Sequence, residues 1–220
     1  EALHRKLFTI HLAEGVEEGE FLTTGGGLWK EWFQQERIPT KIGGPWRDGW
    51  ELLSKKIPHG TRTLLIHGNL LGERSLREIA LNNVSIVHCP LSHHFFGHID
   101  PPLRTWVRLG IPIALGSDSL ASSPTLSLWE SMRLLKKRED FSDNTILRWA
   151  TEGGAAALGL SGITGRLQQG YSADLQLVEW RGEGAPSLLE KPHRVLATFV
   201  AGQLCYAAPS ERSLRSFYDF

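Results

Sequence analysis

The chain has 220 residues, of which 41% are hydrophobic and 22% are charged, and its 24 basic and 24 acidic residues give a formal net charge of zero. This is the composition of an ordinary globular protein, and the length suffices for one large domain or two small ones. The balanced charge, and apolar runs well short of the roughly 18 residues of a membrane span, give no indication of a nucleic-acid or membrane partner.

The first predicted unit is a strand at about residues 7–12, followed by an amphipathic helix at about residues 17–35. A long connection over residues 36–61 is rich in Gly, Pro and Trp, and such loops in compact enzymes are often functional. Because the chain begins with Glu1 rather than Met and enters a strand almost at once, we expect it to be part of a longer protein. The only cysteines, Cys89 and Cys205, are far apart, which favours a reducing compartment, and we expect a cytoplasmic protein.

Three more strand-then-helix units follow. Their strands end near residues 67, 88 and 118, and the helices after them span about residues 73–82, 102–109, 126–137 and 143–158, the last with Asp143 as its N-cap. From about residue 162 the pattern changes to short strands at about residues 173–178, 195–200 and 203–206, with a hairpin turn at Ala201-Gly202. Repeated strand-then-helix units predict an α/β fold with a parallel sheet, followed here by a small β segment.

Acid–base residues stand where the four parallel strands are expected to end: His11, His67, His88 and Asp118. The carboxyl ends of parallel barrel strands are where such enzymes carry their chemistry. Structural histidines do not usually recur in this register, so we favour a functional interpretation of the set. Sequence signals of serine hydrolases, helix-borne zinc proteases and phosphate-binding loops are missing.

Individually these residues carry different weight. Glu14 must lie just past the strand that holds His11. At such a place an imidazole suits a divalent metal and a carboxylate suits proton transfer. The sequence is equally compatible with a buried structural histidine and a glutamate that caps the following helix. Asp118 is favoured as a metal ligand or base, because burying an unpartnered carboxylate costs several kcal/mol; a helix cap is the alternative. His67 is favoured as functional, whereas His88 is as compatible with a structural role.

Four segments resemble successive motifs of the amidohydrolase superfamily, and more narrowly of its aminohydrolase branch. They are residues 11–14 (HLAE), the strand ending at His67, residues 88–93 (HCPLSH) and residues 116–122 (GSDSLAS). This branch includes cytosine, guanine, adenosylhomocysteine and aminodeoxyfutalosine deaminases and the triazine chlorohydrolases. Residues 151–160 and 165–175 resemble the passage from the family's barrel into its C-terminal β-sandwich.

The resemblance implies a (β/α)8 TIM-type barrel. Residues 1–160 would supply strands five to eight, and residues 161–220 part of the β-sandwich. The implied roles are metal ligation of one Zn²⁺ or Fe²⁺ by His11 and Asp118, proton shuttling by Glu14, orientation of the attacking water by His67, and further proton acceptance by Asp118. Candidate substrate contacts are Ser122, His88 and His93. The family's H-x-H ligand pair and strands one to four are absent from this sequence.

The function that follows from the resemblance is metal-assisted hydrolysis that deaminates a purine- or pyrimidine-like amine, with an aminodeoxyfutalosine- or adenosine-type nucleoside favoured. We expect a homodimer of the complete protein and an inactive 220-residue fragment. The alternative is a non-catalytic barrel remnant that acts as a binding or interaction module.

Overall fold

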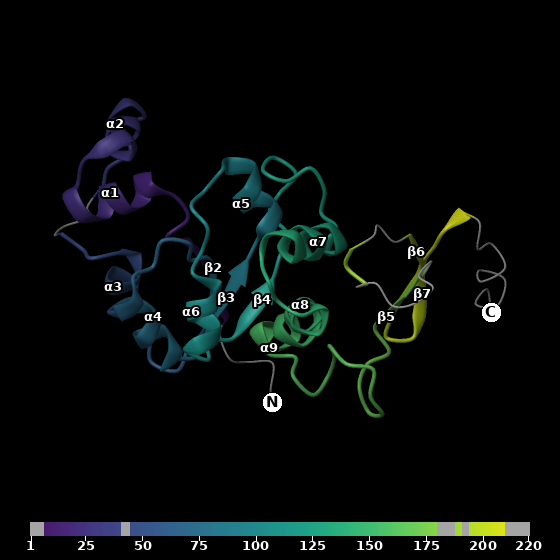
Figure 1. Ribbon diagram of the computed structural model, residues 1–220. Coiled ribbons are helices and arrows are strands. Elements are labelled where there is room, and N and C mark those ends of the chain that lie inside the picture. The colour runs from purple at the N-terminus through teal and green to yellow at the C-terminus, as the bar shows by residue number, and fades with distance from the viewer. Residues whose placement is uncertain (1–6, 41–44, 180–187, 191–193, 210–220) are drawn as a thin grey trace. The chain divides into compact units, whose positions relative to one another are not determined.

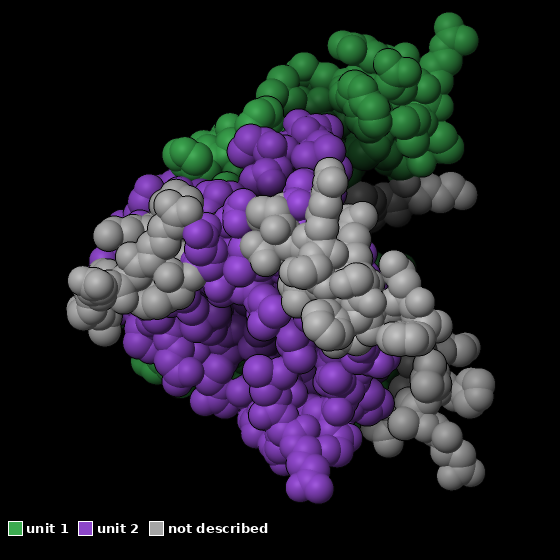
Figure 2. Space-filling view, turned by 90° about the vertical axis from the view of Figure 1, so that its right-hand side faces the viewer, with its two compact units in different colours: residues 1–113 green, residues 114–220 purple. Residues whose placement is uncertain are grey.

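The computed structural model describes residues 7–40, 45–179, 188–190 and 194–209, and Figure 1 labels its elements. The chain forms two compact units, residues 1–113 and 114–220, which Figure 2 shows in green and purple. The strands form two sheets, one of four strands in the order β1-β2-β3-β4 and one of three strands in the order β5-β6-β7. The predicted α/β fold with a small β segment is confirmed.

The first unit is built on parallel strands. They are β1 (Leu7–Leu12), β2 (Arg62–His67) and β3 (Val84–His88), and β4 (Ile113–Leu115) begins at the last residue of the unit. Leu12 of β1 is paired with His67 of β2, and the Ile86 N–H donates to the Pro112 carbonyl just before β4 at 2.9 Å. Because parallel neighbours point the same way, the segments that carry Glu14 and His67 leave the sheet at the same edge.

The six helices described in this unit are α1 (Val16–Thr24), α2 (Gly27–Gln35), α3 (Gly49–Ser54), α4 (Glu73–Ala80), α5 (Pro90–Phe96) and α6 (Leu103–Arg108). The core contains Leu65 of β2, Ile79 of α4, Ile86 of β3 and Trp106 of α6, all fully buried. Burial of a large aliphatic side chain stabilises a fold by about 1.5–3 kcal/mol. This packing makes β2 and β3 a firm support for the residues that follow them.

The prediction of one continuous helix over residues 17–35 was wrong. Gly25 (φ 69°) and Gly27 (φ 77°) adopt left-handed backbone conformations, and this ends α1 before α2 begins. Two short helices, α3 and α5, also occupy segments for which no helix was predicted. The Asp48 side chain caps α3 by accepting from the Glu51 N–H, and Pro90 stands in the first turn of α5, where its missing N–H costs nothing.

The second unit begins with α7 (Leu128–Arg138). A continuous helical stretch follows, made of α8 (Asp143–Arg148), the π-helical turn η2 (Trp149–Gly153) and α9 (Gly154–Leu158), as predicted for residues 143–158. Its N-cap is Ser142 rather than Asp143, since the Ser142 hydroxyl accepts from the Thr145 N–H. No helix among the described residues is long and apolar enough to cross a membrane.

The antiparallel sheet of the second unit comprises β5 (Leu175–Val178), β6 (Val195–Val200) and β7 (Gln203–Ala207). Ala201 (φ 50°) and Gly202 (φ 79°) form the two-residue turn between β6 and β7, which confirms the predicted hairpin. Asp174 holds this turn, because its carboxylate accepts from the Ala201 N–H at 2.7 Å. The boundary at residue 160 between a half barrel and a sandwich segment stays a prediction.

Candidate active site

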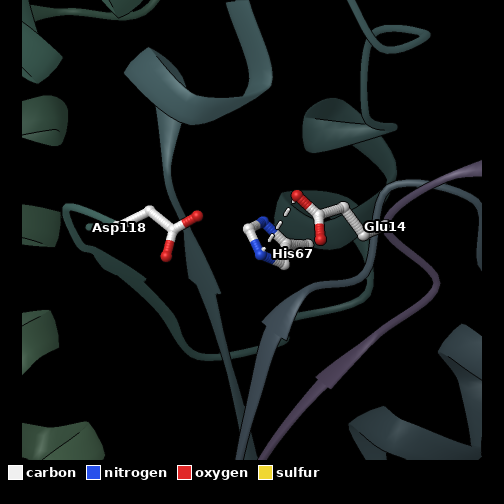
Figure 3. A group of neighbouring side chains, drawn as sticks. All are labelled: Glu14, His67 and Asp118. Atoms are coloured by element: carbon white, nitrogen blue, oxygen red, sulfur yellow. Dashed lines mark ion pairs between the residues drawn. The ribbon is translucent and has the colours of Figure 1, made fainter. Parts of the chain in front are cut away.

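Glu14 and His67 meet at the carboxyl edge of the sheet. The Glu14 Oε1 atom lies 3.5 Å from the His67 Nε2 atom, and Figure 3 marks this contact with a dashed line. The His67 side chain is 1% exposed and the Glu14 side chain 28% exposed. The imidazole is therefore part of the core, and Glu14 Oε1 faces it from a buried position, whereas the rest of the Glu14 side chain is partly exposed.

His67 has a left-handed backbone (φ 73°), which is uncommon for a residue other than glycine. Such a conformation costs about 1–3 kcal/mol and persists only where the surrounding structure enforces it. Here the enforcement is visible, because the Gly68 N–H donates to the Leu12 carbonyl at 2.9 Å and the Leu70 N–H to the Ala13 carbonyl at 3.0 Å. A conformation that is costly and yet enforced indicates a constraint on the position of this residue.

The segment after β1 is tied to the segment after β2 by one further bond. The Asn69 side-chain amide donates to the Glu14 carbonyl at 3.1 Å, so three consecutive carbonyls, those of residues 12–14, accept bonds from residues 68–70. Ala13 is itself left-handed (φ 53°). The backbone that carries Glu14 is thus fixed relative to His67, and its side chain does not depend on a freely moving loop.

A cluster of histidines extends from this pair. The His98 Nε2 atom lies 3.5 Å from the same Glu14 Oε1 atom, which places one carboxylate oxygen between two imidazoles. The His93 Nε2 atom lies 3.3 Å from Asp100 Oδ1, and the His93 ring is 6.0 Å from the His98 ring between centroids. The cluster therefore offers several groups able to hold or pass a proton near Glu14.

Two other predicted site residues contact members of the cluster. His11 is exposed on β1, and its ring centroid lies 5.3 Å from that of His67. His88 is buried, with its ring 5.8 Å from the His93 ring and edge-on to Trp106. The role of His11 as a metal ligand and those of His88 and His93 as substrate contacts stay predictions.

In the second unit, Asp118 lies three residues beyond the end of β4, so the expected strand running to Asp118 is shorter than predicted. The Ser122 hydroxyl donates to Asp118 Oδ2 at 2.7 Å, and the Ser122 N–H donates to the Ser119 carbonyl at 3.1 Å. Ser122 is buried. Its hydroxyl orients the Asp118 carboxylate, and its role as a substrate contact stays a prediction.

Two residues near Glu14, Glu18 and Asn69, were not predicted from the sequence to belong to the site. Glu18 is buried in the first turn of α1, and its carboxylate accepts from the Ala13 N–H at 2.8 Å and the Glu14 N–H at 3.1 Å. A signal was present, because Glu18 shares a helix face with Phe21 and Leu22, both buried. For Asn69 the only sequence signal is its position two residues after His67.

Comparison with known proteins fits this geometry. The profile of the amidohydrolase family matches residues 4–205. The chain belongs to the amidohydrolase family. This confirms the resemblance drawn from the strand-end motifs.

The relatives are deaminases by name. The chain is 31% identical over 208 residues to a 5-methylthioadenosine/S-adenosylhomocysteine deaminase of Pyrococcus furiosus, covering 91% of this chain and 42% of the relative. It is 28% identical over 179 residues to an aminodeoxyfutalosine deaminase of Nitratiruptor, covering 79% of this chain and 42% of that protein. The chain thus spans less than half the length of these relatives.

A solved structure shows the same fold. The crystal structure of the aminofutalosine deaminase of Helicobacter pylori superposes with a TM-score of 0.76 at 19% identity, covering 91% of this chain and 52% of that one. The α/β fold of the chain therefore resembles that of the amidohydrolase barrels, and which barrel strands it supplies remains a prediction.

Proposed function

We propose that the protein containing this chain is a metal-dependent hydrolase that deaminates a purine-like nucleoside. The chain would supply barrel strands five to eight and part of the β-sandwich. The observation that carries the proposal is the Glu14–His67 pair, in which the carboxylate of a partly exposed side chain contacts a buried imidazole held in a left-handed backbone. Relatives named methylthioadenosine/adenosylhomocysteine and aminodeoxyfutalosine deaminases support the substrate class, an amine-bearing heterocycle on a ribose-like group.

The residues at the strand ends fit a divalent cation. In the first unit Glu14 and His67 offer a carboxylate and an imidazole that could hold a metal ion, and in the second unit Asp118 offers a further carboxylate (Figure 3). Such nitrogen and oxygen donors suit Zn²⁺ or Fe²⁺. We propose Asp118 and His11 as ligands, with the other ligands supplied by the missing strands. When bound, the metal would lower the pKa of a water molecule to around 7.

The chain's own residues then divide the proton transfers. The Asp118 carboxylate, oriented by Ser122, accepts a proton from the attacking water. His67 orients that water from its buried position. Glu14 delivers a proton from its carboxyl group to a ring nitrogen of the substrate as the amine-bearing carbon accepts the water oxygen. Asp118 then passes the proton that it took from the water to the amine, which leaves as ammonia, and Glu14 recovers a proton from the added hydroxyl as the carbonyl forms. The Glu14 side chain is 28% exposed, and His98 offers a second imidazole at its Oε1 atom.

The test is ammonia release by the full-length protein from methylthioadenosine, adenosylhomocysteine, adenosine and aminodeoxyfutalosine, with inosine as the substrate without an amine. We expect turnover of at least one amine, loss of turnover on chelation and recovery with Zn²⁺ or Fe²⁺. Asp118→Asn should abolish turnover, whereas Asp140→Asn, at an exposed position of the same unit, should not. A metal-loaded full-length protein that releases no ammonia from any of them would contradict the proposal and favour a non-catalytic barrel remnant.

A further inference from the structure

Glu18 is unusually buried for an acidic residue in the first turn of a helix. It stands in the first turn of α1, yet only 6% of its surface is exposed. Burial raises the pKa of its carboxyl group, and the nearby acids Glu14 and Asp48 act in the same direction. Burying a carboxylate near two others costs free energy that an exposed position would avoid. Such a cost indicates that the carboxylate has a task at this position.

The task is visible in its two hydrogen bonds. Glu18 Oε1 accepts from the Ala13 N–H at 2.8 Å and Glu18 Oε2 accepts from the Glu14 N–H at 3.1 Å. Both amides belong to the turn between β1 and α1, where Ala13 is left-handed. Ala13 is buried, so its N–H would be costly to leave without an acceptor. One carboxylate therefore fixes two successive peptide units beside the side chain that contacts His67.

Gly49, the first residue of α3, leaves the space that this carboxylate needs. A Cβ atom at Gly49 would lie 3.3 Å from Glu18 Oε1 and 2.4 Å from Leu12 Cδ1. A side chain at residue 49 would therefore press on both the carboxylate and the end of β1. Glycine at position 49 therefore leaves room for the Glu18 carboxylate, although the two residues are about thirty positions apart in the sequence.

We infer that Glu18 is a positioning residue, which acts on the reaction only through Glu14. Its carboxylate holds the Ala13–Glu14 turn so that Glu14 Oε1 stays 3.5 Å from the Nε2 atoms of both His67 and His98. This inference rests on the proposed role of Glu14 as the acid. Glu18 contacts no reacting atom, and its effect is to keep the acid where proton transfer can occur.

The variant that tests this is Glu18→Gln in the full-length protein, with Glu20→Gln, at an exposed position of the same helix, as the matched control. Glutamine keeps the shape but has one acceptor oxygen, so one of the two backbone bonds is lost. We expect amide hydrogen exchange at Ala13 or Glu14 to become about tenfold faster or more. We expect kcat to fall about 10- to 100-fold, because a misplacement of about 1 Å can cost that much, with KM changed less than about threefold.

The double variant Glu14→Gln with Glu18→Gln decides whether Glu18 acts through Glu14. If it does, the second change adds no further loss of turnover to the first, since coupled residues are not additive. Losses that multiply would overturn the inference. Unchanged exchange at both amides in Glu18→Gln, or full turnover despite faster exchange, would overturn it as well.

Amide exchange, measured in the wild type and in the two single variants, tests the inference independently of deaminase activity. If Glu18→Gln does not fold, exchange in the wild-type protein still decides, because unprotected amides at Ala13 and Glu14 would show that Glu18 does not hold the turn. If the wild-type protein deaminates nothing, the proposed function fails on its own. The exchange comparison between Glu18→Gln and Glu20→Gln then still supports or overturns the anchoring of the turn.

Discussion

Replacing Glu14 by glutamine separates proton transfer from structure at this site. The backbone of residue 14 is held independently of its side chain, because its carbonyl accepts from Asn69 and its N–H donates to Glu18. Glutamine therefore keeps the position and size of the side chain near His67 and His98 while it removes the proton that a carboxyl group can carry. The change acts on chemistry and leaves the turn in place.

The expected loss can be estimated from this geometry. A positioned general acid contributes roughly 10²- to 10⁴-fold in rate, which corresponds to about 2.7–5.4 kcal/mol of activation free energy at 1.36 kcal/mol per tenfold. Glu14 is 28% exposed and contacts its two imidazoles at 3.5 Å, so its contribution to folding is small. A substitution of this kind usually changes the free energy of unfolding by about 0.5 kcal/mol or less. The rate should therefore fall far more than the stability.

The assay is turnover of the full-length enzyme at saturating amine substrate, with metal content and the urea midpoint measured on the same samples. Glu20→Gln is the control for loss of one carboxylate from this segment. We expect Glu14→Gln to lose at least about 100-fold in kcat with its metal retained. Turnover within threefold of wild type would refute the role of Glu14 as acid, and loss of the metal in parallel would make Glu14 a ligand instead.

Three further predictions follow from single contacts. Ser122→Ala removes the 2.7 Å hydrogen bond to Asp118 Oδ2. Since a hydrogen bond to a charged group is worth about 1.5–3 kcal/mol, kcat should fall about 10- to 100-fold. An unchanged kcat would show that Ser122 does not orient Asp118. His67→Gly should be more stable in urea than His67→Ala by about 1 kcal/mol, because φ is 73° there; equal midpoints would contradict the strain. The pKa of the Glu18 carboxyl group is raised in the folded protein, so folding favours its protonated form. The stabilisation from this preference is fully present below pH 4.5 and is lost as the pH rises through the folded pKa. Above pH 4.5 the urea midpoint of the wild type should therefore fall relative to that of Glu18→Gln, and a rise would contradict the raised pKa.

Much of the fold could be predicted because hydrophobic patterns carry it. β1, β2 and β3 lie where their apolar runs predicted them, and the stretch over residues 143–158 is helical throughout. The predicted helix over residues 17–35 is broken because Gly25 and Gly27 take left-handed conformations that an amphipathic pattern does not reveal. The short helices α3 and α5 were not predicted, because the Gly-, Pro- and Trp-rich connection around α3 and the histidine-rich run of α5 show no clear amphipathic pattern.

The residues of the candidate site were likewise predicted only in part. Glu14 and His67 could be placed together because parallel strands end at one edge, and the structure has them in contact. Glu18 was not predicted, since an acidic residue in the first turn of a helix is ordinarily exposed there. The contact of His98 with Glu14 could not be predicted, because it depends on how α5 ends at Gly97, in the left-handed region.

The central claim is that a divalent metal binds at the carboxyl ends of these strands and is held in part by Asp118. Anomalous diffraction at the zinc or iron edge, from crystals of the full-length protein, tests it most directly. The account predicts one metal peak at roughly 2.0–2.2 Å from an Asp118 carboxylate oxygen and from a His11 ring nitrogen, with Glu14 nearby and not coordinated. A metal bound away from Asp118, or no metal peak in crystals of active enzyme, would contradict it.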